Sequence, residues 1–410
     1  MKQMIVRCEP DSTQMALLEH GRLVEFAIER SEETGVVGSL FKGRVINVIP
    51  GMQAAFVDIG QKKNAFLYID DVLHPHLEKQ PKLKPSITEL LKVGQELIVQ
   101  VVKDALGTKG ARVTTHYSLP GRWIVYMPIS GYVAVSKRIE RESERNRLRQ
   151  LGEELRLEEE GLIIRTVAEN ERAEAIKEDL LFLRAQWKAI MSRSETVQVP
   201  GLLHQDLSMV QRLMRDVYIP QTGELILDNK KQAEEAASFL EGMLQGELPR
   251  VQEYKDDKPI FEAYGIQQQL NKDFQRKTWL PGGGYLIWDQ TEALTVIDVN
   301  TGKFTGTDNL EDTVYQTNLE AAAEIARLLR LRDTGGIVII DFIDMEIEDN
   351  RSSVLNMLEL KMRPDRTQHH ILGWTKLGLL ELTRKKMREG NGGAHFDVCT
   401  VCQGTGRVKR

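Results

Sequence analysis

The first 30 residues alternate apolar and polar side chains on both sides of Glu19-His20-Gly21. Alternation with a period of two is typical of strands that bury one face, and a turn-like tripeptide between two such runs favours a β-hairpin. The chain is therefore predicted to open with the hairpin of an α/β domain.

Short β-rich runs separated by glycines follow over residues 37–118, and this spacing predicts a small barrel. From Ser136 to about Arg193, leucines and isoleucines recur at helical spacing among charges of alternating sign, which indicates solvated amphipathic helices. A short apolar strand at 161–164 separates the two helical stretches and is followed by Arg165 and Thr166.

A strand–helix–strand pattern occupies part of the last third of the chain. A strand-like run ends near Asp298, a long helical pattern stops at Gly335-Gly336, and a second apolar run leads to Asp341. A right-handed crossover makes the two strands of such a unit parallel. Because the carboxyl ends of parallel strands share one edge of a sheet, Asp298 and Asp341 are predicted to meet there.

Asn300 lies two residues beyond Asp298 and therefore faces the same side of the strand. Two carboxylates beside an amide are a suitable oxygen-ligand set for magnesium, which can activate water and stabilise charge on a scissile phosphate. Strand-end aspartates also cap the turns or helices that follow them, and this alternative stays open. The direction of Asp344 depends on where the second strand ends.

Charge and length narrow the class of protein. The 410 residues are enough for several domains with buried cores. The 55 basic and 60 acidic residues give a net charge of −5, so any nucleic-acid-binding surface must be local. No apolar run approaches the roughly 18 residues of a membrane span, and the first residues lack the apolar segment of a secretory signal. We therefore expect a cytoplasmic protein.

Two of the three cysteines, Cys399 and Cys402, form a C-x-x-C pair near the end of the sequence. A tetrahedral structural zinc needs four ligands, so the same pair from a second subunit would complete a site shared across a homodimer. A thiol redox pair and an exposed free pair are the alternatives.

The predicted barrel carries Phe56 and Phe66 on strand-like segments, with Lys103 and Lys109 in the same region. OB-type barrels bind single strands with aromatic faces that stack bases and cations that follow phosphates. Each phenylalanine taken alone is more typical of a core. Their coincidence with the glycine-flanked loop 107–110 favours a binding face.

Several segments together resemble the ribonuclease E/ribonuclease G family of bacterial endoribonucleases, in its compact ribonuclease G-like form. They are residues 41–60, 161–170, 296–302, 317–345 and 399–406. The resemblance implies an α/β multidomain fold in which an OB-fold RNA-binding barrel and a 5′ sensor region interrupt a ribonuclease-H-like domain. A DNase-I-like catalytic domain and a zinc link then follow. The implied boundaries are 1–36 and 215–281 for the interrupted domain, 37–118 for the barrel, 119–214 for the sensor, 282–397 for the catalytic domain and 398–410 for the link.

The resemblance also implies roles for single residues. Asp298 and Asp341 would ligate magnesium, and Asn300 would support them or the substrate. The implied 5′-monophosphate sensor comprises Arg165, Thr166 and, through its backbone, Val125. Single-stranded RNA would be held by Phe56, Phe66 and Lys109, with Lys103 as a weaker candidate. Zinc would join Cys399 and Cys402 of two subunits in a homodimer or homotetramer, although Thr400 stands where the family has proline.

The implied function is a magnesium-dependent endoribonuclease that cleaves single-stranded, A/U-rich RNA and prefers a 5′ monophosphate. Its products would carry 5′-phosphate and 3′-hydroxyl ends, and its roles would be rRNA maturation and mRNA turnover. The alternative is a non-catalytic RNA-binding or assembly protein that retains the fold.

Overall fold

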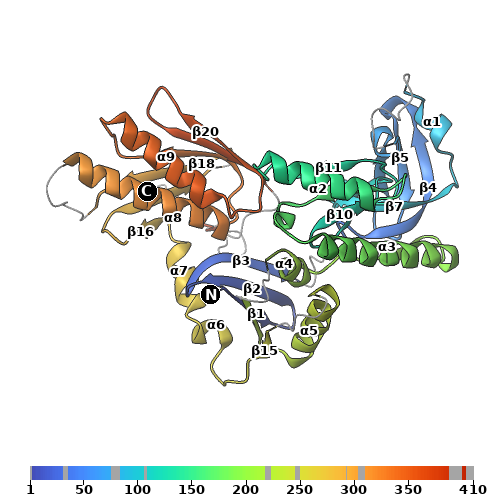
Figure 1. The fold of residues 1–410 in the computed structure, drawn as a ribbon, viewed down its shortest axis with the longest axis horizontal. Helices are drawn as coiled ribbons and strands as arrows, with labels where there is room; N and C mark the ends of the chain where they lie inside the picture. The colour runs from blue at the N-terminus through green and yellow to red at the C-terminus, as the bar shows by residue number, and fades with distance from the viewer. Residues whose placement is uncertain are drawn as a thin grey trace. The chain divides into compact units, whose positions relative to one another are not determined.

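The computed structural model describes residues 2–30, 36–74, 84–105, 109–217, 223–244, 250–291, 293–302, 310–386 and 399–402. The chain divides into two compact units (Figure 1). The first comprises residues 1–32, 218–238 and 247–410, and the second comprises residues 33–217 and 239–246. Among the helices of the described residues, none combines the length and apolar character needed to cross a membrane.

The second unit begins with the predicted barrel. Its strands follow the order β13-β4-β5-β6-β8-β7, and an additional β4–β7 pairing closes it. The bounds are β4 (Leu40–Ile49), β5 (Ala54–Asp58), β6 (Ala65–Tyr68), β7 (Glu96–Lys103), β8 (Arg112–Thr114) and β13 (Gly201–His204), with α1 (Ile87–Leu90) between β6 and β7. Alternate apolar residues such as Val45, Val57, Leu67 and Val99 are fully buried inside it. The sequence pattern therefore predicted this barrel correctly.

The described residues of the second unit also form a four-stranded sheet and the helices that pack with it. The sheet order is β11-β12-β10-β9. The elements are β9 (Leu119–Pro120), β10 (Ile124–Met127), β11 (Val133–Val135), α2 (Glu142–Leu155), β12 (Gly161–Ile164), α3 (Ala173–Thr196) and α4 (Met209–Val217). The two predicted charge-rich helices are confirmed as α2 and α3. Helix α3 buries Ile176, Leu180, Leu183 and Ile190 against this sheet, since apolar residues recur on one of its faces.

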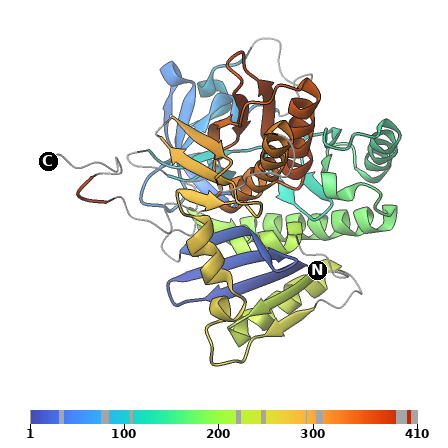
Figure 2. The same ribbon diagram turned by 90° about the vertical axis from the view of Figure 1, so that its left-hand side faces the viewer.

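The first unit contains a sheet built from two distant parts of the chain. Its order is β15-β14-β1-β2-β3, with β1 (Lys2–Cys8), β2 (Ser12–Glu19), β3 (Arg22–Arg30), β14 (Gly223–Leu227) and β15 (Val251–Glu253). Figure 2 shows the blue N-terminal strands beside the yellow-green later ones. The predicted hairpin is confirmed as β2 and β3, which join at His20 and Gly21. Helix α5 (Lys230–Leu244) follows β14.

After β15 the chain forms two short helices rather than one continuous helix. It forms α6 (Ile260–Ala263) and α7 (Ile266–Asp273). Gly265 between them has φ 65°, a left-handed backbone conformation that ends the first helix.

The first unit also contains a six-stranded sheet, in the order β16-β17-β18-β19-β21-β20. The elements are β16 (Lys277–Trp279), β17 (Tyr285–Gln290), β18 (Leu294–Asn300), α8 (Leu310–Leu331), β19 (Gly336–Asp341), α9 (Glu348–Met362), β20 (His369–Trp374) and β21 (Leu380–Arg384). Strands β18 and β19 are parallel and are connected through α8, which confirms the predicted strand–helix–strand unit. Buried residues of α8, α9 and one sheet face share a single core.

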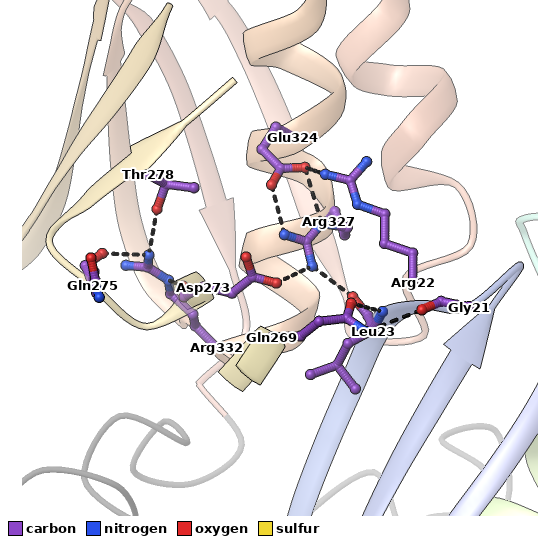
Figure 3. Close-up of polar contacts among 10 residues, drawn as sticks. All are labelled: Gly21, Arg22, Leu23, Gln269, Asp273, Gln275, Thr278, Glu324, Arg327 and Arg332. Carbon is purple, nitrogen blue, oxygen red and sulfur yellow. Dashed lines mark hydrogen bonds and ion pairs between the residues drawn. The ribbon is translucent and has the colours of Figure 1, made fainter. Parts of the chain in front are cut away.

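An ion-pair network joins α8 to β3 and α7 within the first unit (Figure 3). The Arg327 guanidinium contacts the carboxylates of Glu324 at 2.6 Å and Asp273 at 2.8 Å, and it donates to the Leu23 carbonyl oxygen. Arg22 of β3 pairs with the same Glu324 at 2.5 Å. The three central side chains are less than a tenth exposed, so these contacts anchor α8 to the N-terminal hairpin.

Candidate functional site

Asp298 and Asp341 lie directly opposite each other at the ends of β18 and β19. The residues before them, Ile297 and Ile340, are fully buried, so strand alternation turns both carboxylates to the other, exposed face of the sheet. The juxtaposition predicted from the strand–helix–strand pattern is therefore present.

Asn300 shares this face and contacts the pair. Its side-chain amide Nδ2 donates a hydrogen bond of 2.8 Å to Oδ2 of Asp298. The bond orients the Asp298 carboxylate and leaves the amide oxygen of Asn300 as a further acceptor. One strand end thus supplies a carboxylate and an amide, and its neighbour supplies a second carboxylate.

The carboxylates repel one another electrostatically. Partial burial raises the pKa of Asp341, and the negative charges of Asp298 and Asp344 raise it further. Because β19 ends at Asp341, Asp344 lies beyond the strand, close enough for its charge to act on Asp341. A divalent cation would relieve this repulsion.

The donor set fits magnesium. The described residues contain no cluster of three or more histidine, cysteine, aspartate or glutamate side chains arranged to hold a metal. The candidate site instead offers two carboxylates and one amide. Two carboxylates and an amide leave most coordination positions to water and substrate phosphate. Magnesium usually binds in this way, since it keeps several waters and takes one or two protein carboxylates.

Asn318 of α8 fixes the segment that follows Asp341. Its side chain is fully buried, its Nδ2 donates to the Ile343 carbonyl oxygen at 2.8 Å, and its Oδ1 accepts from the Ile343 N–H at 3.1 Å. Sequence reasoning missed this residue. The available signal was an asparagine among alanines on an apolar helix face, because a buried amide requires partners.

The barrel presents its predicted residues in one row across neighbouring strands. Phe56 pairs with Phe66 across β5 and β6, Phe66 pairs with Arg112 of β8, and Arg112 pairs with Lys103 of β7. The two rings are half-buried and meet edge to face, with centroids 5.9 Å apart. Lys103 and Lys109 are exposed, while residues 107 and 108 of the predicted loop lie outside the described residues.

Arg165 is held immediately after β12. Its Nη1 donates to the carbonyl oxygens of Gly121 at 2.7 Å and Arg122 at 3.2 Å, and its Nη2 lies 2.8 Å from Oδ1 of Asp216. Thr166 follows, with its hydroxyl 2.8 Å from that of Ser136. Val125 lies on the adjacent strand β10, opposite Ile163 of β12. The three predicted sensor residues therefore lie on neighbouring segments.

Comparisons with known proteins decide the family. The model of the Ribonuclease E/G family matches residues 118–387. The chain belongs to the ribonuclease E/G family. It is 43% identical to Ribonuclease G of Salmonella typhimurium (strain SL1344) and 42% identical to Ribonuclease G of Escherichia coli (strain K12), each over 99% of this chain and 84% of the relative. It is 39% identical to Ribonuclease E of Nostoc sp. (strain PCC 7120 / SAG 25.82 / UTEX 2576), over 91% of this chain and 55% of that protein.

Membership of the ribonuclease E/G family makes this chain an endoribonuclease, as the sequence resemblance predicted. RNA is accordingly its substrate class.

Two aspartates in this ribonuclease E/G family member support Arg165 and were missed from sequence. Asp179 of α3 accepts the backbone N–H groups of residues 122, 123 and 124 at 2.8–3.2 Å, and its burial raises its pKa. Burial alone would also raise the pKa of Asp216, but the guanidinium groups of Arg215 and Arg165 outweigh it and lower that pKa. A charge-dense helical pattern does not indicate which carboxylate turns inward.

The cysteine pair of this endoribonuclease has the chemistry of a metal ligand. Cys399 is exposed and Cys402 is half-buried. Backbone N–H groups of Cys402 and Val401 lower the pKa of the Cys399 thiol, which favours the thiolate that binds zinc. Two thiolates would supply two of the four ligands that a tetrahedral zinc site needs.

Proposed function

We propose that this endoribonuclease cleaves single-stranded RNA at the sheet face formed by Asp298, Asn300 and Asp341. The observation that carries the proposal is the in-register pairing of the two aspartates on parallel strands, with the Asn300 amide bound to Asp298. In this proposal the six-stranded sheet with α8 and α9 is the DNase-I-like catalytic domain. The N-terminal sheet with β14 and β15 is the ribonuclease-H-like domain.

The carboxylates of Asp298 and Asp341 would hold magnesium at this face. Magnesium held there would supply an activated water and would offset charge on the scissile phosphate. Asn300 orients the Asp298 carboxylate, and Asn318 fixes the backbone that follows Asp341. The resulting RNA fragments would carry 5′-phosphate and 3′-hydroxyl ends.

The barrel of the second unit is the proposed OB-fold RNA-binding domain. Phe56 and Phe66 would stack bases, while Lys103 and Lys109 would follow the phosphates. A/U-rich segments are the expected targets, as the family resemblance implies. Processing of rRNA precursors and turnover of mRNA are the corresponding roles.

The sheet around β10 and β12 is the proposed 5′ sensor. Arg165 and Thr166 would bind a terminal RNA monophosphate, with Val125 contributing its backbone, because a guanidinium fork and a hydroxyl suit a phosphate monoester. The contacts from Gly121, Arg122 and Asp216 fix the Arg165 side chain before RNA arrives. This preorganisation supports a binding role.

Replacing Arg165 with alanine is expected to erase the preference for 5′-monophosphorylated over 5′-hydroxyl RNA. Hydrogen bonds to charged groups contribute about 1.5–3 kcal/mol, so the wild-type preference should exceed about tenfold in kcat/KM and fall to about one in the variant. The measurement compares kcat/KM on two RNAs that differ at the 5′ end alone. Arg156→Ala is the matched control, because it removes another arginine, which follows α2 and pairs with Glu153 of that helix. A preference that survives in Arg165→Ala refutes the sensor.

Zinc held by Cys399 and Cys402 of two subunits would link this endoribonuclease into a homodimer, which could pair further into a homotetramer. The lowered pKa of Cys399 supports this proposal, because it favours the thiolate that binds zinc.

A further inference from the structure

A cation–aromatic cluster lies on the same sheet face as the candidate catalytic residues. It consists of Lys277 and Trp279 of β16 and Tyr285 of β17. Trp279 pairs in register with Tyr285, and Tyr285 pairs with Asn300 of β18. Adjacent strands lie about 4.8 Å apart, so Trp279 is about 10 Å from Asn300 across the sheet.

The cluster faces outward because side chains along β16 point alternately to the two faces of the sheet. Thr278 between Lys277 and Trp279 is 2% exposed and points to the core, whereas Trp279 is 43% exposed. The Lys277 Nζ lies 4.3 Å from the centroid of the Trp279 ring and 3.6 Å from that of Tyr285. The two aromatic rings meet edge to face with centroids 5.3 Å apart.

The backbone that follows Asn300 packs against this cluster. A Cβ on Gly302 would lie 2.4 Å from the Gly283 carbonyl oxygen and 3.0 Å from the Tyr285 ring, and Gly302 itself has φ 59°. The close approach requires glycine at this position. The aromatic cluster and the strand end that carries Asn300 are therefore parts of one packed surface.

This combination of side chains is suited to a nucleotide. An exposed indole can stack on any of the bases, and an adjacent ammonium group can pair with a phosphate of the same nucleotide. A ribonuclease must also hold the nucleotides that flank the bond it cuts, so that the phosphate stays aligned with the carboxylates.

We propose that Trp279, Tyr285 and Lys277 form a subsite for a nucleotide next to the scissile phosphate. The base stacks on Trp279, Tyr285 supports the indole edge, and Lys277 contacts a backbone phosphate. The inference rests on the proposed catalytic role of Asp298 and Asp341, since it takes its position relative to them.

Steady-state cleavage of a 5′-monophosphorylated single-stranded oligoribonucleotide tests the subsite. Trp279→Ala should raise KM by at least about fivefold, with kcat within about twofold of wild type, and Trp279→Phe should recover most of the affinity because it can still stack. Leu372→Ala removes another exposed apolar side chain, at the β20 edge of the same sheet, and should leave KM unchanged. Circular dichroism confirms that each variant is folded.

A set of substrates with one abasic nucleotide at successive positions locates the stacked base. For wild type, one abasic position near the cleaved bond should raise KM, and the same substrate should cause no further rise in Trp279→Ala. An unchanged KM in Trp279→Ala, or additive effects at every abasic position, overturns the subsite. A change in sedimentation with unchanged KM also overturns it and assigns the cluster to a contact between protein chains. Wild-type turnover in both Asp298→Asn and Asp341→Asn would instead refute the catalytic assignment, whatever the Trp279 variants do.

Discussion

Asp298→Asn and Asp341→Asn are each expected to lower kcat for RNA cleavage by about 10³-fold or more, with little change in RNA affinity. Asparagine keeps the shape of each side chain but removes one of the two negative charges that would hold magnesium. A bound metal contributes several kcal/mol of transition-state charge stabilisation, and each 1.36 kcal/mol corresponds to a factor of ten in rate. Single-turnover cleavage and equilibrium binding of the same RNA separate the two effects.

The same variants should be no less stable than wild type. The charges of Asp298 and Asp344 raise the pKa of Asp341, so neutralising Asp298 removes a repulsion. Asp289→Asn is the matched control. Asp289 is an exposed carboxylate on β17 of the same sheet, and it pairs with Arg276. Its turnover should remain near wild type. Wild-type turnover in both Asp298→Asn and Asp341→Asn would refute this site.

Arg327→Met is expected to destabilise the first unit by about 3–5 kcal/mol. Arg327 is 9% exposed and lies between the buried carboxylates of Glu324 and Asp273. Removing the guanidinium leaves both without their main partner, which is far costlier than losing an exposed ion pair. Urea denaturation, followed by tryptophan fluorescence, measures the change in the midpoint of unfolding. Backbone amides of α8 should also exchange their hydrogens faster in the variant than in wild type.

Lowering the pH should reduce the difference in stability between Arg327→Met and wild type. Burial alone would raise the pKa of Glu324, but Arg327 outweighs it and holds the pKa below its usual value. In wild type this carboxylate therefore contributes stability above its unfolded pKa and loses it as pH falls through the folded pKa. The Arg327→Met variant lacks that contribution, so its stability should approach that of wild type as pH falls.

Arg276→Met provides the comparison. Arg276 and Asp289 are 68% and 51% exposed, and exposed pairs contribute at most about 1 kcal/mol. Equal losses in Arg276→Met and Arg327→Met would contradict the role assigned to the buried network.

The paired aspartates could be predicted because they follow from two simple regularities. Apolar runs before Asp298 and Asp341 indicate buried strands, and a helix between them makes those strands parallel, so their ends meet. The barrel and the opening hairpin could be predicted equally well, because period-two alternation and glycine spacing are local properties of the sequence. The family resemblance added roles to residues that the patterns had indicated, and it also added Val125, which no pattern had indicated.

Other features depend on partners that are distant in sequence. Asp179 and Asp216 lie in charge-rich helices, where nothing local distinguishes an inward carboxylate from a solvated one. Asn318 acts on Ile343, 25 residues away, and this contact exists only once α8 packs beside β19.

The most direct test of the central claim is magnesium-dependent cleavage of a fluorescent, 5′-monophosphorylated single-stranded RNA by the full chain. The assay is run in magnesium, in excess EDTA and after magnesium is restored, with product ends identified by a 5′-phosphate-dependent exonuclease. We expect cutting in magnesium, none in EDTA, recovery when magnesium is restored, and products with 5′-phosphate ends. Cutting that persists in EDTA, or binding without cutting at every magnesium concentration, would contradict it.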